Sequence, residues 1–191
     1  MRKVFLALAG VALAISASAC APTGDTNPNP TDGQVQPTLP AIDPSLIPTA
    51  APASVIDVDP NLFLTQYGDY LFRVGQGPTW CSISPEFGYA ICEQNEVAAQ
   101  YATIPVPATC DYSYGFQVRL WGVKPEAGQA AEFPCSGGAF ADPNGAATLE
   151  DGQRITVAPY DCWVQGDTAR CENETGDYVV LGPKAWALGN S

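Results

Sequence analysis

The sequence predicts a mainly β domain, a small antiparallel sandwich or barrel stapled by three disulfides. Three observations support this fold class. Residues 111–120 alternate polar with aromatic or aliphatic side chains, which is the period of a strand with one buried face. Other short β-branched and aromatic runs are separated by Gly, Pro and Asn-Gly turns. Six cysteines follow residue 80, an even number that can pair completely.

The N-terminus predicts export. Arg2 and Lys3 precede an apolar run, Val4–Ile15, and a row of small residues then ends at Cys20. This order of charge, apolar run and small residues is typical of a signal peptide, here residues 1–19. The apolar run is twelve residues long, whereas a membrane-spanning helix needs roughly twenty.

Cys20 is the predicted site of lipid attachment. The residues before it resemble a bacterial lipobox, in which the cysteine sulfur receives a diacylglyceryl group and the cysteine becomes the first residue of the mature chain. Ala17 stands where leucine is more usual. Setting Cys20 aside leaves six of the seven cysteines, which can pair. The alternative is cleavage by the ordinary signal peptidase, which leaves Cys20 as a free thiol in a secreted protein.

Residues 20–55 form the predicted linker between the anchor and the domain. Beyond Cys20 the stretch is rich in proline and contains no aromatic residue, Lys or Arg. It cannot bury enough apolar surface to offset chain entropy, so a disordered, partly polyproline-like tether is expected. Residues 56–191 contain all four Trp and all eight Tyr, enough aromatic side chains for the core of one domain.

The composition argues against several functions. The formal net charge is −12, and it becomes more negative when Arg2 and Lys3 leave with the signal. Such a surface repels nucleic acid, so no nucleic-acid partner is expected. Histidine is absent, which removes the commonest general base and metal ligand. We therefore assign no catalytic residue, cofactor or metal site. The favoured interpretation of the negative charge is that it keeps the protein soluble. The more specific alternative is that it attracts cations or a basic partner.

The cysteines of the domain are predicted to form structural disulfides. The chain has neither a C-x-x-C redox motif nor the closely spaced cysteines of a zinc site. Export places these residues in an oxidising compartment. They are Cys81, Cys92, Cys110, Cys135, Cys162 and Cys171.

Six cysteines allow fifteen pairings, and the local sequence favours one of them. A two-residue turn at Gly166-Asp167 sets Cys162 directly opposite Cys171, within disulfide range. The pair Cys81–Cys92 flanks a longer turn in the same way. The pair Cys110–Cys135 then follows by elimination.

The chain resembles an uncharacterised domain that recurs in secreted and lipid-anchored actinobacterial proteins. The resemblance rests on WCSISPEFGYAIC, CDYSYGFQVRLWG and LEDGQRITVAPYDCWVQGDTARCENETGDYVVLG. The matching residues are Leu149, Gly152, Tyr160, Cys162, Cys171, Asn173, Thr175, Gly176 and Tyr178. The chain departs from the pattern at Ala158-Pro159, where Gly is common, and at Asp177, which replaces a His-Gly. The resemblance implies export, cysteine pairing and a β fold, and it implies no activity.

Two short motifs have a structural and a functional interpretation. Asp57, Asp59 and Asn61 imitate the start of a calcium loop, but the glycine and distal glutamate of an EF-hand are missing. Asp59 followed by Pro60 instead predicts a short helical turn. Asn173 begins a formal glycosylation sequon, and with a bacterial-type signal we expect it to shape a tight turn with the following glycine.

Trp121 and Trp163 are candidates for stacking against sugars, although packing in the core or at a sheet edge is the favoured interpretation. The sequence thus predicts an exported, lipid-anchored envelope protein with a non-catalytic binding or interaction domain. It would lie at the outer face of the cell membrane or in the cell wall, where it meets an envelope protein or polysaccharide. The alternative from another class is a cell-envelope glycan hydrolase that uses two facing carboxylates.

Overall fold

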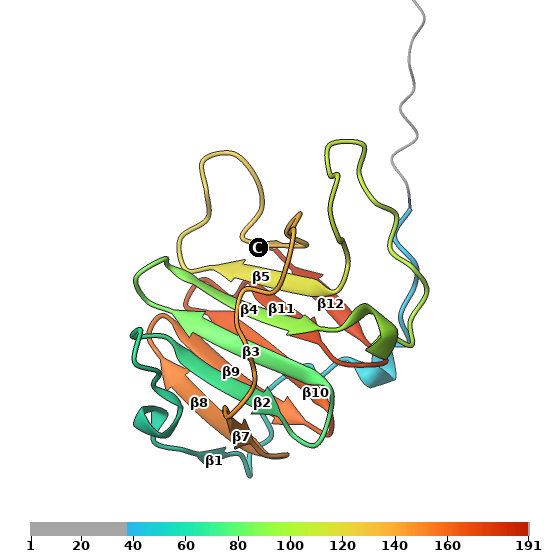
Figure 1. Cartoon of the computed structure of the whole chain (residues 1–191). Helices are drawn as coiled ribbons and strands as arrows, with labels where there is room; N and C mark the ends of the chain where they lie inside the picture. Colours follow the sequence, from blue (N-terminus) through green and yellow to red (C-terminus); the bar gives the residue numbers. More distant parts are fainter. Residues whose placement is uncertain (1–37, 191) are drawn as a thin grey trace, which may run out of the picture. The chain divides into compact units, whose positions relative to one another are not determined.

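Two six-stranded sheets pack face to face in this protein (Figure 1). The structure is a computed structural model and describes residues 38–190. Sheet A has the strand order β1-β8-β9-β10-β11-β12, and sheet B the order β6-β5-β4-β3-β2-β7. Among the described residues, helical structure is limited to three short 3-10 turns. The predicted mainly β fold with three disulfides is confirmed.

The elements are short, as the turn-rich sequence predicts. Sheet A consists of β1 (Ile56–Asp57), β8 (Gln153–Val157), β9 (Tyr160–Gln165), β10 (Thr168–Asn173), β11 (Tyr178–Leu181) and β12 (Trp186–Gly189). Sheet B consists of β6 (Ala131–Glu132), β5 (Gln117–Trp121), β4 (Tyr89–Gln94), β3 (Thr79–Ser84), β2 (Tyr70–Val74) and β7 (Ala147–Leu149). The 3-10 turns are η1 (Pro44–Leu46), η2 (Pro60–Phe63) and η3 (Glu96–Ala98).

The two sheets repeat one topology. Strands β2 to β5 form an antiparallel meander in sheet B, as β8 to β11 do in sheet A. A further antiparallel strand follows each meander, β6 in one sheet and β12 in the other. The strand before each meander pairs in parallel with the other meander, β1 with β8 and β7 with β2. Each sheet is therefore mainly antiparallel, as the sequence predicts, with one parallel pair at its edge.

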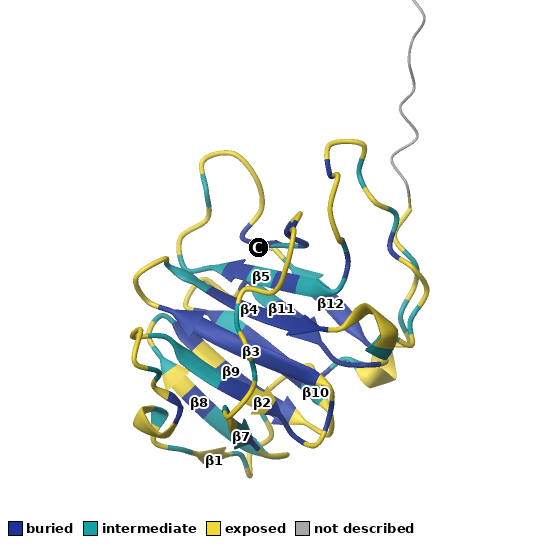
Figure 2. Ribbon diagram, viewed as in Figure 1, coloured by how far each residue is buried: buried dark blue, intermediate teal, exposed yellow. Residues whose placement is uncertain are grey.

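The core lies between the two inner faces, where buried apolar residues of both sheets meet, and β3 is buried along its whole length (Figure 2). In β5 the inward residues are Val118 and Leu120, which confirms the period of two read from the sequence. The row Phe72, Cys81, Cys92 and Val118 crosses sheet B. The equivalent row in sheet A is Ile155, Cys162, Cys171 and Val179.

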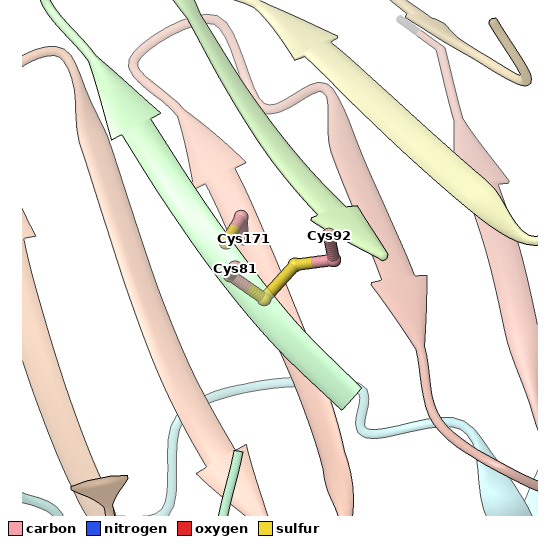
Figure 3. A group of neighbouring side chains, drawn as sticks. All are labelled: Cys81, Cys92 and Cys171. Atoms are coloured by element: carbon pink, nitrogen blue, oxygen red, sulfur yellow. A yellow bond between two sulfur atoms is a disulfide. The ribbon is translucent and has the colours of Figure 1, made fainter. Parts of the chain in front are cut away.

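Two disulfides form the centre of this core. Cys81–Cys92 and Cys162–Cys171 each join directly opposite residues of a hairpin, with Cα atoms 4.0 Å apart. The sulfur atoms of Cys81, Cys92 and Cys171 lie within 4.8 Å of one another (Figure 3). One disulfide from each sheet therefore packs against the other across the sandwich. The third disulfide, Cys110–Cys135, joins the connection between β4 and β5 to the segment that follows β6.

Residues 38–55, assigned to the linker from composition, contact sheet A. The side chain of Asp43 accepts a hydrogen bond from the amide of Ser45 at 2.9 Å and so caps η1. The guanidinium Nη1 of Arg170 donates to the carbonyl oxygen of Pro48 at 2.7 Å. The signal, Cys20 and linker residues up to 37 lie outside the described residues. Within residues 38–190, we find no helix of the length and apolarity that crossing a bilayer requires.

Candidate binding surface on the outer face of sheet B

The connection between β6 and β7 crosses the outer face of sheet B, in front of β4 and β3 (Figure 1). Its residues 137–146 are termed strap B. Beneath it, Trp80, Glu93 and Gln117 form a row of register neighbours on three adjacent strands. Because the neighbouring Cys81, Cys92 and Val118 face the core, this row faces outward.

Glu93 fixes strap B to the sheet. Its Oε1 accepts hydrogen bonds from Gln117 Nε2 at 2.8 Å and from the amide of Phe140 at 2.7 Å. Its Oε2 accepts hydrogen bonds from Trp80 Nε1 at 3.1 Å and from the amide of Ala141 at 3.0 Å. Each carboxylate oxygen thus accepts two hydrogen bonds, which fills the usual acceptor capacity of the group.

This environment gives Glu93 an anchoring role. The residue is 1% exposed. Burial raises the pKa of its carboxyl, while the hydrogen bonds from strap B, Trp80 and Gln117 act in the opposite direction. A carboxylate whose lone pairs are all occupied has no free position from which to exchange a proton with a ligand. Glu93 therefore holds the polypeptide in place, and general acid or base catalysis would require strap B to leave.

A tryptophan and a charged residue also form a cross-strand pair beside the disulfide of sheet A. Trp163 and Arg170 lie one residue from the paired cysteines on the side toward the hairpin turn, whereas Trp80 and Glu93 lie on the side away from it. The Arg170 guanidinium lies 3.6 Å from the centre of the Tyr178 ring and donates to the carbonyl oxygen of Pro48. Arg170 thus holds one backbone carbonyl group over sheet A, whereas Glu93 holds two backbone amides over sheet B.

An aromatic cluster lies beside strap B on the outer face of sheet B. It consists of Phe87, Tyr89, Trp121 and Phe140. The ring of Tyr89 is central, with centroids 6.0 Å from Phe87, 5.8 Å from Trp121 and 6.1 Å from Phe140. Phe87 is 62% exposed and Phe140 is 40% exposed. The cluster therefore presents an apolar surface to solvent in a protein with many acidic residues.

An ion pair supports one side of the cluster. Arg119 donates through Nε and Nη2 to Glu132 Oε1, at 3.0 and 2.6 Å. Its guanidinium also stacks 4.4 Å from the ring centre of Trp121. Trp121 Nε1 donates to the same Glu132 oxygen at 3.0 Å. These contacts confirm the edge-packing interpretation of Trp121, because both its ring face and its polar atom have protein partners.

Two pockets flank strap B. A pocket of about 180 Å³ is lined by Trp80, Glu93 and Gln117 among others. A second pocket, of about 360 Å³, lies between strap B and the segment before β2. Its lining includes Tyr67 and Phe140. Its volume falls at the lower end of the range of small-ligand sites.

The residues that imitate a calcium loop serve separate structural roles. Asp57 Oδ1 accepts a hydrogen bond from Arg154 Nε at 2.7 Å and pairs β1 with β8. Asp59 Oδ1 accepts a hydrogen bond from the amide of Asn61 at 2.9 Å and caps η2, which confirms the predicted helical turn. Within residues 38–190, the one cluster of metal-ligand atom types is that of the core cysteines. Their sulfurs are engaged in disulfides, so they are not thiolate ligands.

The six predicted cysteines pair as the local sequence favours, in the disulfides described above.

Asn173 shapes a tight turn, as the sequence predicts. Its Oδ1 accepts hydrogen bonds from the amides of Thr175 and Asp177, and its Nδ2 donates to the carbonyl oxygen of Trp121. Gly176 completes the turn with a positive φ of 88°. The side-chain amide therefore joins the turn to sheet B.

Trp163 is 2% exposed, which confirms packing rather than sugar contact at this position.

Sequence reasoning missed Glu93 and the aromatic cluster. Glu93 lies in β4 between Cys92 and Gln94, both of which are buried. An acidic residue directly after a cysteine of the predicted hairpin is unusual, and this was the signal that the sequence offered for its role. Its partners lie 47 and 48 positions further along the chain, so the sequence did not reveal them.

Comparisons of the chain with known protein families, with curated proteins and with solved structures found no match.

Proposed function

We propose that this protein is exported, anchored to the cell membrane by a lipid on Cys20, and acts as a non-catalytic binding domain of the cell envelope. The N-terminal pattern supports export and lipid attachment. Three disulfides indicate an oxidising, extracellular environment. The resemblance to secreted and lipid-anchored actinobacterial domains agrees with this location.

The observation that carries the binding proposal is the exposed aromatic cluster beside the 360 Å³ pocket. Solvent-exposed aromatic rings next to a pocket are typical of ligand and partner sites. Several features support binding over catalysis. The chain has no histidine, its six domain cysteines are bonded in pairs, and Glu93 is committed to strap B.

The anchor is tested by the mass of the mature protein isolated from cell membranes. We expect a chain that begins at Cys20 and carries acyl groups. The matched variant is Cys20→Ala, which should be released from the membrane fraction. An unacylated mature chain would refute the lipid anchor and favour the free-thiol alternative.

The binding surface is tested by photo-crosslinking in intact cells. A photo-crosslinking amino acid replaces Phe140, which is in the aromatic cluster, or Glu174, an exposed residue in the turn between β10 and β11. We expect a discrete adduct from position 140 and none of the same mass from position 174. Identical patterns from the two positions, or no adduct from position 140, would overturn the proposed surface.

A further inference from the structure

The 360 Å³ pocket combines carboxylates with aromatic rings. Asp69, in the segment before β2, and Asp142, in strap B, both line it. Tyr67 and Phe140 come from the same two segments. Its floor includes Leu71 and Ser82, which face each other on β2 and β3. No Lys or Arg is among the residues that line it.

The carboxylate of Asp69 is available to a ligand. It is partly buried, and across residues 38–190 no hydrogen-bond donor or cationic side chain pairs with it. Burial, and then the charge of Asp69, raise the pKa of Tyr89, so this charge acts on the aromatic cluster. Asp142 accepts a hydrogen bond from the amide of Asn144 at 3.0 Å and remains exposed.

The aromatic rings at this pocket suit a cation. Tyr67 is 77% exposed, and its ring therefore has a free face. A ring face attracts an ammonium or guanidinium group that lies within about 6 Å. Arg119, which stacks on the Trp121 ring of the aromatic cluster, is already paired with Glu132. Among residues 38–190, no cationic side chain lies within ion-pair distance of Asp69.

We infer that this pocket binds a lysine or arginine side chain of a partner protein, with the cationic group between Asp69 and the ring of Tyr67. The inference rests on the proposed binding function and adds the chemistry of the ligand. The size of the pocket suits one long side chain, and the exposed rings of Phe87 and Phe140 suit apolar neighbours in the partner. The formal net charge of −12 favours a basic partner over an acidic one.

The test uses the full chain with its disulfides intact and a fluorescein-labelled peptide, Gly-Leu-Lys-Leu-Gly, followed by fluorescence anisotropy. In two matched peptides, norleucine or glutamate replaces the lysine. The protein variants are Asp69→Asn and Tyr67→Ala. The control is Glu174→Gln, which removes the same charge from an exposed turn of sheet A.

We expect only the lysine peptide to bind, and its affinity to fall by about tenfold or more in both pocket variants. The control should stay within about twofold of the wild type, because its charge lies elsewhere. Equal loss in Glu174→Gln would mean general attraction to an acidic protein and would overturn the inference. Equal binding of the norleucine peptide would overturn it as well.

A third arm separates a glycan ligand from a basic peptide. Binding of an N-acetylglucosamine hexamer that is weakened by Tyr67→Ala, without binding of the lysine peptide, would refute the cation site. Absence of peptide binding together with a discrete adduct from position 140 would leave the proposed binding function standing and remove this inference alone.

Discussion

Replacement of Glu93 by glutamine tests the role of this carboxylate in holding strap B. The variant keeps the size of the side chain and one acceptor oxygen. Two of the four donors then face an amide nitrogen instead of an oxygen, whichever way the new amide is oriented. Gln117 cannot turn its own amide to compensate, because its Nε2 also donates to the carbonyl oxygen of Gly138 at 2.8 Å.

Each buried donor left without an acceptor costs about 1 to 3 kcal/mol, so with two such donors we expect Glu93→Gln to lower the free energy of unfolding by about 2 to 6 kcal/mol. Chemical denaturation measures this loss. The matched control, Glu126→Gln, changes an exposed residue and should stay within about 0.5 kcal/mol of the wild type. Hydrogen exchange should also become faster at the amides of Phe140 and Ala141. A variant as stable as the control, with unchanged exchange at these amides, would refute the anchoring role.

Three further predictions concern the rest of the domain. Gly115→Ala should destabilise the fold by about 2 kcal/mol or more, because Gly115 has a φ of +87° and an added Cβ would lie 2.8 Å from the side chain of Ile104. The control is Gly138→Ala, whose added Cβ would meet nothing within 4 Å. Thermal denaturation should show the control to be nearly as stable as the wild type. Mild reductant should open Cys110–Cys135 before the two core disulfides, because Cys135 is exposed and the core cysteines are buried. Mass spectrometry after thiol alkylation would show the order in which the disulfides open. Loss of a core disulfide first would contradict this prediction. Burial raises the pKa of Tyr101 to about 12, so the folded state keeps a proton that the unfolded chain loses near pH 10. The free energy of unfolding should therefore fall as the pH rises from 10 toward 12, and Tyr101→Phe should flatten that fall in denaturant titrations.

Local patterns in the sequence predict much of this fold. Counting residues outward from Gly166-Asp167 predicts the register that places Cys162 opposite Cys171, and the structure has this register. The alternation in residues 117–121 predicts which side chains of β5 face the core. In both cases the information lies within one hairpin or one strand, where the period of two fixes the geometry.

Long-range features of the fold were beyond this reasoning. Strands β1 and β7 have two and three residues, which is too short for a periodic pattern, and each pairs with a strand distant in sequence. The repeated topology was hidden because the two stapled hairpins differ in length, with cysteines separated by 11 and by 9 positions. Strap B contains mainly small residues, so its composition predicts a loop without fixed contacts. In the structure, Glu93 fixes its backbone through the amides of Phe140 and Ala141.

The two outer faces show how one topology can give a closed face and an open one. Over sheet A, the segment that Arg170 holds is centred on Pro48, which has no amide hydrogen and offers only its carbonyl oxygen. A guanidinium suits that group, and Arg170 and Trp163 are both buried beneath the segment. Over sheet B, strap B turns two amides inward, and only an acceptor such as Glu93 can hold them. This fixes the backbone of Phe140 and leaves its ring exposed beside Tyr89. A fixed backbone with an exposed ring reduces the entropy lost on binding. For this reason we place the binding function on sheet B and not on the equivalent face of sheet A.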